Sequence, residues 1–167
     1  MEYLQVFDQF KNKLDEKIDR EVKKTLTGNK YFMIVLLFIE NDNKFLLQKT
    51  SINRNSEIAT TGGHVTYGDD GYITVFKEAK EELNIELEAN LLKLIDIIIC
   101  GNCYIEIYYT NQKIDINEIK IQEEEVLSVN WYSIDEINEL INDNKFRKGN
   151  IKPFEKILEY RKALYDK

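Results

Sequence analysis

The sequence predicts an α/β fold, an α/β/α sandwich around a mixed β-sheet, from three observations. Residues 31–39 are apolar on both faces, as expected of a central strand covered by helices on each side. Apolar residues in 72–83 recur at spacings of three and four, which is typical of a helix with one buried stripe. Another helix is predicted after Pro153. Helices on both faces of a sheet give three layers.

The next predicted elements are the strand that follows the central strand and the N-terminal segment. Residues 40–43 turn the central strand back, and residues 45–49 form a second strand that pairs with it as a hairpin. At the N-terminus, periodicity by itself predicts an amphipathic helix, because the apolar residues follow helical spacing: Phe7, Phe10, Leu14, Ile18 and Val22.

The predicted helix at 72–83 carries its apolar stripe on Tyr72, Val75, Phe76, Ala79 and Leu83. After it, residues 91–99, 104–109 and 126–131 are predicted strands. Ser133 and Glu136 form a capping box that opens a further helix.

Cys100 and Cys103 form a Cys-x-x-Cys pattern, which is found in redox pairs and in halves of zinc sites. Here they flank Gly101-Asn102 between two apolar runs, so we interpret them as the strand ends of a tight hairpin. Zinc needs two more ligands, and the chain has one histidine. A cytosolic disulfide is also uncommon, so we expect free thiols.

Length and charge narrow the functional classes. A chain of 167 residues is within the range of one domain, which we assign to 1–167. A net charge of -7 argues against nucleic acid or anionic membrane as partner. Met1-Glu2-Tyr3 lacks the features of a signal peptide, and no apolar run is long enough to span a membrane, so we expect a cytoplasmic protein. An anionic substrate would need help from a cation.

Three glutamates, Glu78, Glu81 and Glu82, fall on one face of the predicted helix, beside its apolar stripe. Like charges at these spacings each disfavour a helix by about 0.2 to 0.5 kcal/mol, a fault that a divalent cation corrects. A solvated acidic face is the alternative interpretation. The glycines at 62 and 63 favour the metal, since glycine lets a backbone carbonyl approach an ion closely.

Residues 63–85 closely resemble the Nudix box, the signature of the Nudix hydrolase superfamily. The pattern runs without a gap as Gly63, five residues, Asp69, seven residues, Lys77-Glu78-Ala79, one residue, Glu81-Glu82, one residue and Asn84-Ile85. Asp69 replaces the glutamate of the family and Lys77 its arginine, so a pair that ties loop to helix loses the bidentate guanidinium fork. Asn84 replaces a glycine just after the helix, where a left-handed conformation is needed that Asn also adopts.

The resemblance implies the site residues and the cofactor. In the family, glutamates matching Glu78, Glu81 and Glu82 bind magnesium or manganese at a diphosphate, so the implied cofactor is Mg²⁺ or Mn²⁺. Gly63 is implied as a carbonyl ligand and Glu125 as an extra metal carboxylate, against the alternative of a solvated loop at 123–125. Glu78 is the leading general-base candidate, and Glu81 is the other predicted catalytic residue.

Two further assignments concern the substrate, expected to be a small nucleotide-like diphosphate. Lys49 is a candidate phosphate contact, with a solvated lysine as the alternative. Tyr67, Tyr104 and Tyr108 are candidates for stacking on a base, with packing as the alternative. A homodimer is left open.

The resemblance leaves three functions to weigh. The first is Mg²⁺-dependent hydrolysis of a diphosphate linkage in a nucleoside diphosphate joined to a group X. The second is isomerisation of isopentenyl diphosphate, because residues 3–20 are similar to the N-terminal hairpin of the Nudix branch related to that isomerase; on this ground we expect a hairpin there. Gly62 stands where that enzyme has a cysteine, and His64 is the sole histidine, which disfavours it. The third is a non-catalytic nucleotide sensor, which is disfavoured because all three helix glutamates are retained.

Overall fold

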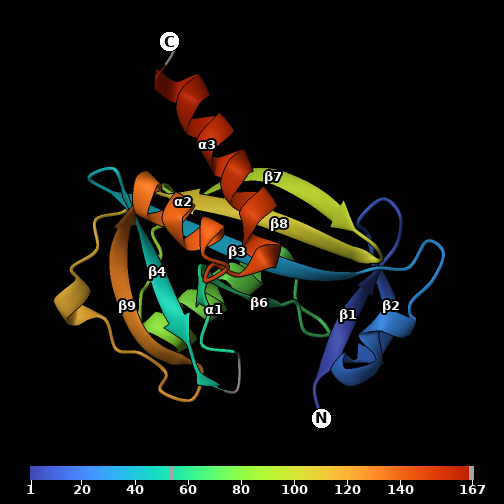
Figure 1. Cartoon of the computed structure of the whole chain (residues 1–167). Coiled ribbons are helices and arrows are strands. Elements are labelled where there is room, and N and C mark those ends of the chain that lie inside the picture. The colour runs from blue at the N-terminus through green and yellow to red at the C-terminus, as the bar shows by residue number, and fades with distance from the viewer. Residues whose placement is uncertain (53–54, 166–167) are drawn as a thin grey trace.

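The computed structural model describes residues 1–52 and 55–165 of the chain. Strands and helices are arranged in the order shown in Figure 1. The strands are β1 (Tyr3–Phe7), β2 (Lys13–Asp19), β3 (Phe32–Asn41), β4 (Lys44–Thr50), β5 (Ile58–Ala59), β6 (Thr61–His64), β7 (Lys93–Cys100), β8 (Cys103–Thr110) and β9 (Val126–Ser133). The helices are α1 (Gly71–Leu83), α2 (Ile134–Asn142) and α3 (Ile151–Tyr165), with 3-10 turns η1 (Arg20–Thr25), η3 (Ile116–Glu118) and η4 (Lys148–Asn150).

The main sheet is mixed, as predicted. Within the described residues it has seven strands, with β5, β4, β3, β8 and β7 as neighbours, β6 on β3 and β9 on β4. β3 runs parallel to β8 and antiparallel to β6. The predicted hairpin of β3 and β4 is present but opens at once, since the two strands pair only from Glu40 to Phe45 and from Asn41 to Lys44. β6 then takes the place of β4 beside β3.

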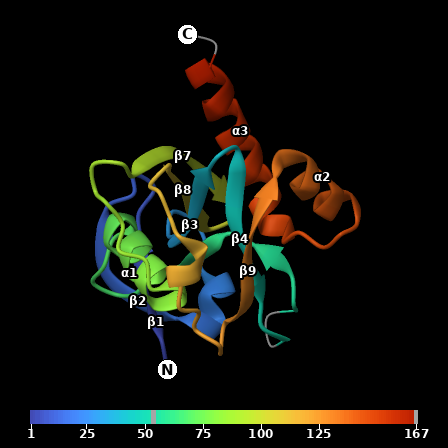
Figure 2. The same cartoon turned by 90° about the vertical axis from the view of Figure 1, so that its left-hand side faces the viewer.

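Helices cover both faces of the sheet, which confirms the α/β/α sandwich. On one face Val75, Ala79 and Leu83 of α1 pack with Val35 and Leu37 of β3. On the other face lie α2 and α3, whose Ile137, Phe154 and Ile157 pack with Phe38 and Phe45. Figure 2 shows α1 on one side of the strands and both C-terminal helices on the other. Successive β3 residues alternate between the two cores because strand side chains alternate between faces.

The boundaries of helix α1 agree with the prediction within one residue, but not every residue of the predicted apolar stripe is buried. Tyr72 was predicted to be buried, yet 49% of it is exposed, and its ring packs on Phe76 instead. Thr74 is buried in its place and donates from Oγ1 to the Asp70 carbonyl at 2.7 Å. Asn84 ends the helix in the left-handed region, with φ of 57°, as the sequence predicted.

The N-terminal hairpin is confirmed, and the helix that periodicity predicted there is wrong. β1 and β2 pair antiparallel, and β1 buries Leu4, Val6 and Phe7 against the rest of the molecule. Backbone hydrogen bonds from Gln5 to Val65 and from Phe7 to Tyr31 attach it. The helical spacing was coincidental: Phe10 lies in the turn between the strands and is 73% exposed.

The cysteine hairpin and the capping box are both confirmed. Cys100 and Cys103 are paired across the β7–β8 turn, and Gly101 takes the positive φ that the turn needs. Both thiols are free, Cys100 exposed and Cys103 buried. Ser133 and Glu136 cap α2 reciprocally. Within the described residues, no helix is both long and apolar enough to cross a membrane.

Candidate active site

Strand β6 makes two close approaches through glycines, one to helix α1 at Gly63 and one to strand β3 at Gly62. A Cβ atom at Gly63 would overlap the carboxyl group of Glu78, and one at Gly62 would overlap the carbonyl of Val35. At Gly62 the clash is with backbone, so only glycine fits, whereas a side chain at Gly63 would push the Glu78 carboxylate aside. Glycine at 63 lets the backbone lie directly against that carboxylate. Gly63 and Glu78 therefore lie side by side, as the resemblance implied.

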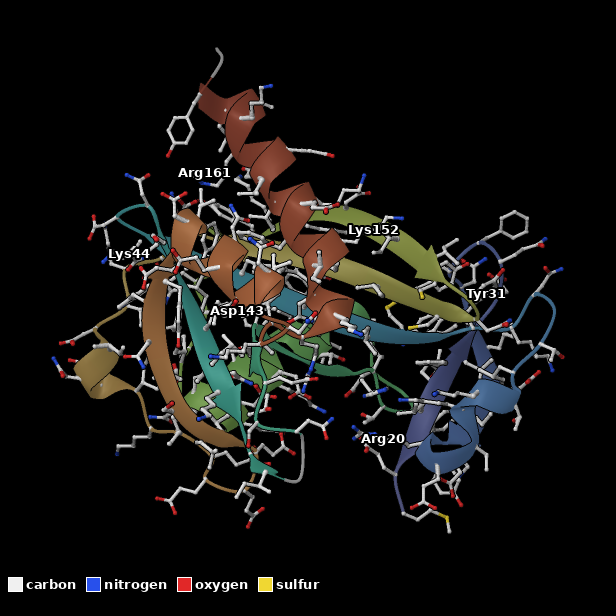
Figure 3. The ribbon with its side chains drawn as sticks, viewed as in Figure 1. Arg20, Tyr31, Lys44, Asp143, Lys152 and Arg161 are labelled. Carbon is white, nitrogen blue, oxygen red and sulfur yellow. The ribbon has the colours of Figure 1, made fainter. Side chains whose placement is uncertain are left out.

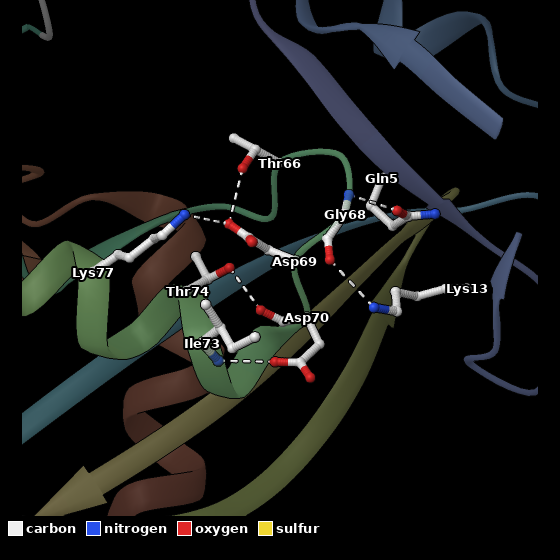
Figure 4. Close-up of polar contacts among 9 residues, drawn as sticks. All are labelled: Gln5, Lys13, Thr66, Gly68, Asp69, Asp70, Ile73, Thr74 and Lys77. Carbon is white, nitrogen blue, oxygen red and sulfur yellow. Dashed lines mark hydrogen bonds and ion pairs between the residues drawn. The ribbon is translucent and has the colours of Figure 1, made fainter. Parts of the chain in front are cut away.

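The loop between β6 and α1 is held by polar contacts (Figure 4). Asp69 Oδ2 accepts from Lys77 Nζ at 2.7 Å and from Thr66 Oγ1 at 3.1 Å. The loop-to-helix pair thus forms even with the shorter acid and the lysine. These hydrogen bonds, Lys77 first, hold the pKa of Asp69 below its ordinary value. Asp70 caps the helix, its Oδ1 accepting from the backbone of Ile73 at 2.8 Å.

The N-terminal hairpin supports the same loop. Gln5 accepts on its side-chain oxygen from the backbone of Gly68 at 2.9 Å, and Lys13 donates to the Gly68 carbonyl at 3.3 Å (Figure 4). Gly68 itself has φ of 94°, a conformation that L side chains rarely adopt. The hairpin therefore positions the loop that precedes the acidic helix.

The three helix glutamates share a face but differ in burial. Glu82 is only 1% exposed, Glu78 is partly buried and Glu81 is exposed. Glu82 Oε2 accepts from Gln48 Nε2 of β4 at 2.8 Å, and Gln48 Oε1 in turn accepts from Thr61 at 3.2 Å. The alternative interpretation, a solvated acidic face, therefore does not hold for Glu82, which is buried and hydrogen-bonded.

Burial and neighbouring charge raise the pKa of Glu78 to about 8. Loss of solvation is the largest cause, followed by the negative charges of Glu82, Glu81 and Glu125 and a hydrogen bond with Glu82. Without a cation, the cluster relieves its repulsion by keeping a proton. A divalent ion would do the same work with two positive charges.

A cavity of about 490 Å³ joins these residues. Gly63, Glu78, Glu81, Glu82 and Glu125 all line it. Its apolar lining includes Ile34, Leu36 and Ile105, and Arg20 and Arg147 also line it. The glycine and the four glutamates were predicted from the sequence to form one site, and the fold brings all five to one cavity.

Other predicted site residues lie elsewhere. Lys49 is exposed and is not among the residues lining the cavity, whereas its neighbour Gln48 is buried and does line it. Strand alternation places the two side chains on opposite faces of β4. Among the stacking candidates, Tyr104 and Tyr108 belong to the core on the α1 side, and Tyr67 is 44% exposed outside the cavity lining. These positions do not support contact with a substrate in this cavity.

His64 lines the cavity but has structural contacts. Its Nε2 lies 2.6 Å from Lys23 Nζ, and its ring stacks on Phe32 with centroids 5.9 Å apart. Burial, the largest cause, lowers the pKa of Lys23. These contacts agree with the hydrogen-bonding role expected for His64.

Comparison with known families agrees with this geometry. The sequence profile described as NUDIX domain matches residues 30–155. The chain belongs to the Nudix family. That description does not distinguish branches, so the affinity to the isopentenyl diphosphate isomerase branch stays a prediction. No curated protein matched the chain.

Solved structures share this Nudix fold at low sequence identity. DR0079 from Deinococcus radiodurans is 16% identical with a TM-score of 0.70, over 90% of this chain and 94% of that one. A NUDIX hydrolase from Nitrosomonas europaea is 20% identical with a TM-score of 0.60, over 80% and 90%. An Ap4A hydrolase from C. elegans, solved as a binary complex, is 15% identical with a TM-score of 0.57, over 79% and 98%.

The donor set of this Nudix cavity suits a hard divalent ion. Mg²⁺ prefers carboxylate and carbonyl oxygens, and it retains several waters instead of filling an all-protein cage. Among the described residues, no group of three or more histidine, cysteine, aspartate or glutamate side chains is already arranged to hold a metal ion. Four carboxylates line this cavity, and burial together with the neighbouring charges raises the pKa of one of them, Glu78. Such a set fits an ion that arrives with its own waters and a phosphate.

Sequence reasoning missed several cavity residues, among them Gln48, Arg20 and Arg147. Gln48 was detectable, because it directly follows three apolar residues of β4 and is buried as they are. Arg20 and Arg147 had no local signal, since they lie 127 positions apart and meet at the cavity only through the fold.

Proposed function

We propose that this Nudix protein is a metal-dependent hydrolase that cleaves a diphosphate linkage in a nucleoside diphosphate joined to a group X. The observation that carries the proposal is the gathering of Glu78, Glu81, Glu82 and Glu125 around one cavity beside the backbone of Gly63. The cavity volume, about 490 Å³, falls within the range of small-molecule sites, about 300 to 1,000 Å³.

The residues that would hold Mg²⁺ or Mn²⁺ are Glu78, Glu81, Glu82, Glu125 and the carbonyl of Gly63. When bound, the ion supplies a Lewis acid for phosphoryl oxygen and lowers the pKa of water. Gln48 keeps the Glu82 carboxylate turned into the cavity through its 2.8 Å hydrogen bond. Thr61 fixes Gln48, so the orientation of Glu82 is set by two strands.

Glu78 is the proposed general base for the attacking water. A base works best when its pKa is near the working pH. In the metal-free protein, burial and the neighbouring carboxylates raise the pKa of Glu78 to about 8. A cation at the cluster would lower that pKa and leave the group able to accept a proton near neutrality. Glu81, exposed at the cavity, is the second candidate for this role.

The other two functions gain no support from the geometry. An isomerase of the kind considered needs a cysteine before Gly63, and a side chain at Gly62 would overlap the Val35 carbonyl. A non-catalytic sensor has no need of Glu78, Glu81 and Glu82 beside one another in a cavity. Hydrolysis uses every one of these features.

A substrate screen with Mg²⁺ and Mn²⁺ tests the proposal. It would cover nucleoside triphosphates, nucleotide sugars, ADP-ribose, dinucleotide polyphosphates and prenyl diphosphates, with products identified by mass. We expect metal-dependent turnover of at least one nucleotide. It should fall by about a hundredfold or more in Glu82→Gln and be retained in Glu139→Gln, a matched change on α2 outside the cavity lining. No turnover with either metal, or full turnover in Glu82→Gln, would contradict it.

A further inference from the structure

Two arginines from distant parts of the chain line the same cavity as the acidic cluster. Arg20 begins η1, directly after the N-terminal hairpin, and Figure 3 labels it on that unit. Arg147 lies between α2 and α3, in the segment that pairs with β5. Neither belongs to the Nudix box.

Both arginines have fixed backbones and oriented side chains. The Arg147 amide donates to the Ile58 carbonyl at 2.9 Å, and its Nε donates to Glu57 Oε2 at 2.9 Å. The Arg20 amide donates to the Glu2 carbonyl at 3.0 Å, and its Nη1 donates to Glu2 Oε2 at 2.7 Å. A guanidinium has five N–H donors in a rigid fork, so one hydrogen bond to a carboxylate leaves donors for another anion.

The cavity is lined by many negative charges, so an anionic ligand needs these two arginines in order to bind there. Six glutamates line it among the described residues, four in the cluster and two as partners of the arginines, and the described lining includes no lysine. A metal ion at the cluster would neutralise the phosphates that it binds. Any additional phosphate would face glutamates with the two arginines as its cationic partners.

We propose that Arg20 and Arg147 form a second anion subsite, which binds a phosphate of group X that the metal does not reach. The proposal rests on the proposed function for the metal end of the cavity. It identifies the substrate class as compounds in which X itself carries phosphate, such as nucleoside triphosphates and dinucleoside polyphosphates. Nucleotide sugars, whose X is uncharged, gain nothing from the arginines.

Glu57 and Glu2 then act as positioning residues. Each holds a guanidinium at the cavity wall in the absence of ligand, and each competes with an incoming phosphate for it. Removing the Glu57 charge therefore increases the affinity of the cavity for anions. A gain that came only from removing a negative charge at the cavity wall would persist when Arg147 is replaced as well.

Binding of inorganic tripolyphosphate in the presence of EDTA, measured by calorimetry, tests the subsite without metal or turnover. We expect binding to the wild type, a loss of about tenfold or more in Arg147→Gln and Arg20→Gln, and a smaller loss in Arg147→Lys, which keeps charge without the fork. Glu57→Gln should bind several-fold more tightly, but not when combined with Arg147→Gln.

Lys44→Gln is the matched control, because it removes the same charge at an exposed residue at the far end of the molecule from Arg20 (Figure 3). Circular dichroism and thermal midpoints establish that each variant is folded. Equal affinities in Lys44→Gln and the arginine variants, or no binding by the wild type, would overturn the subsite. Neither outcome bears on the hydrolysis, which the metal-dependent screen tests separately.

A kinetic comparison gives the second readout. In the arginine variants, kcat/KM should fall at least tenfold more for a nucleoside triphosphate than for a nucleotide sugar. An equal fall of kcat/KM for both substrates would show that the arginines do not distinguish a phosphorylated group X from an uncharged one.

Discussion

Gln48 on β4 donates a hydrogen bond from Nε2 to Oε2 of Glu82 on α1 over 2.8 Å, linking the sheet to the acidic helix inside the cavity. Gln48 is 4% exposed and Glu82 is 1% exposed, so water does not replace this bond. The relationship makes a strand residue outside the Nudix box part of the proposed metal site.

Gln48→Leu should weaken Mg²⁺ binding, because Glu82 loses the donor that orients it. Removing a partner from a buried polar group costs about 1 to 3 kcal/mol, so the free energy of unfolding should fall by that amount. Urea unfolding and Mg²⁺ titration by calorimetry measure the two effects. Gln112→Leu is the control: it removes hydrogen bonds to Glu86 and Glu88 outside the cavity, and should leave Mg²⁺ affinity unchanged.

Glu82→Gln should lower turnover by about a hundredfold to a thousandfold, as when a group that stabilises transition-state charge is lost. Metal-free stability at pH 7 should stay the same or rise, because the change removes a charge that repels Glu78. Thermal midpoints with and without Mg²⁺, measured beside turnover, test both parts. An active variant with the wild-type stabilisation by metal would remove Glu82 from the site.

Mg²⁺ affinity should rise from pH 6 to about pH 9, because the pKa of Glu78 is raised to about 8 and the ion must displace its proton. The same shift makes the metal-free protein less stable as pH rises. Between the ordinary value of 4.5 and about 8, the folded state binds more protons than the unfolded state, so the free energy of unfolding falls. Glu78→Gln should flatten both profiles, and unchanged profiles would contradict this account of Glu78.

Lys77→Ala should loosen the loop before α1 with little effect on overall stability. The pair with Asp69 is largely exposed on the Lys77 side, and such pairs contribute about 0 to 1 kcal/mol. Amide exchange at Gly68 and Asp69 should accelerate, whereas Lys80→Ala, which breaks the exposed pair with Glu86, should leave it unchanged. The pKa of Asp69 is depressed, so its contribution to stability is present above pH 3.8 and is lost as pH falls through the lowered pKa.

Replacing Cys100 and Cys103 together by serine should leave the turnover number within a few-fold of the wild type. Neither thiol lines the cavity, and the pair closes a hairpin instead. Burial raises the pKa of the Cys103 thiol to about 12, which keeps it protonated and unreactive. A collapse of activity in a folded double variant, judged by circular dichroism, would give the Cys-x-x-Cys pattern a catalytic part.

The sequence by itself determined the elements whose local pattern matches their final environment. The apolar run of β3, the stripe of α1, the Ser133 capping box and the turn at Gly101 are specified by residues adjacent in the chain. The box also predicted that Gly63 and the α1 glutamates would meet, because loop and helix are continuous. The left-handed conformation of Asn84 could be predicted from the sequence, because few residue types fit such a position.

Tertiary structure decided whatever depends on partners far apart in the chain. The N-terminal segment has helical spacing, but pairing with Val65 and Tyr31 makes it a strand, since packing overrides a weak local preference. Sheet register turned Gln48, and not Lys49, toward Glu82. The sequence carries no sign that Arg20 and Arg147 share a cavity, because the two residues come together only when β5, the hairpin and the segment before α3 assemble around β3.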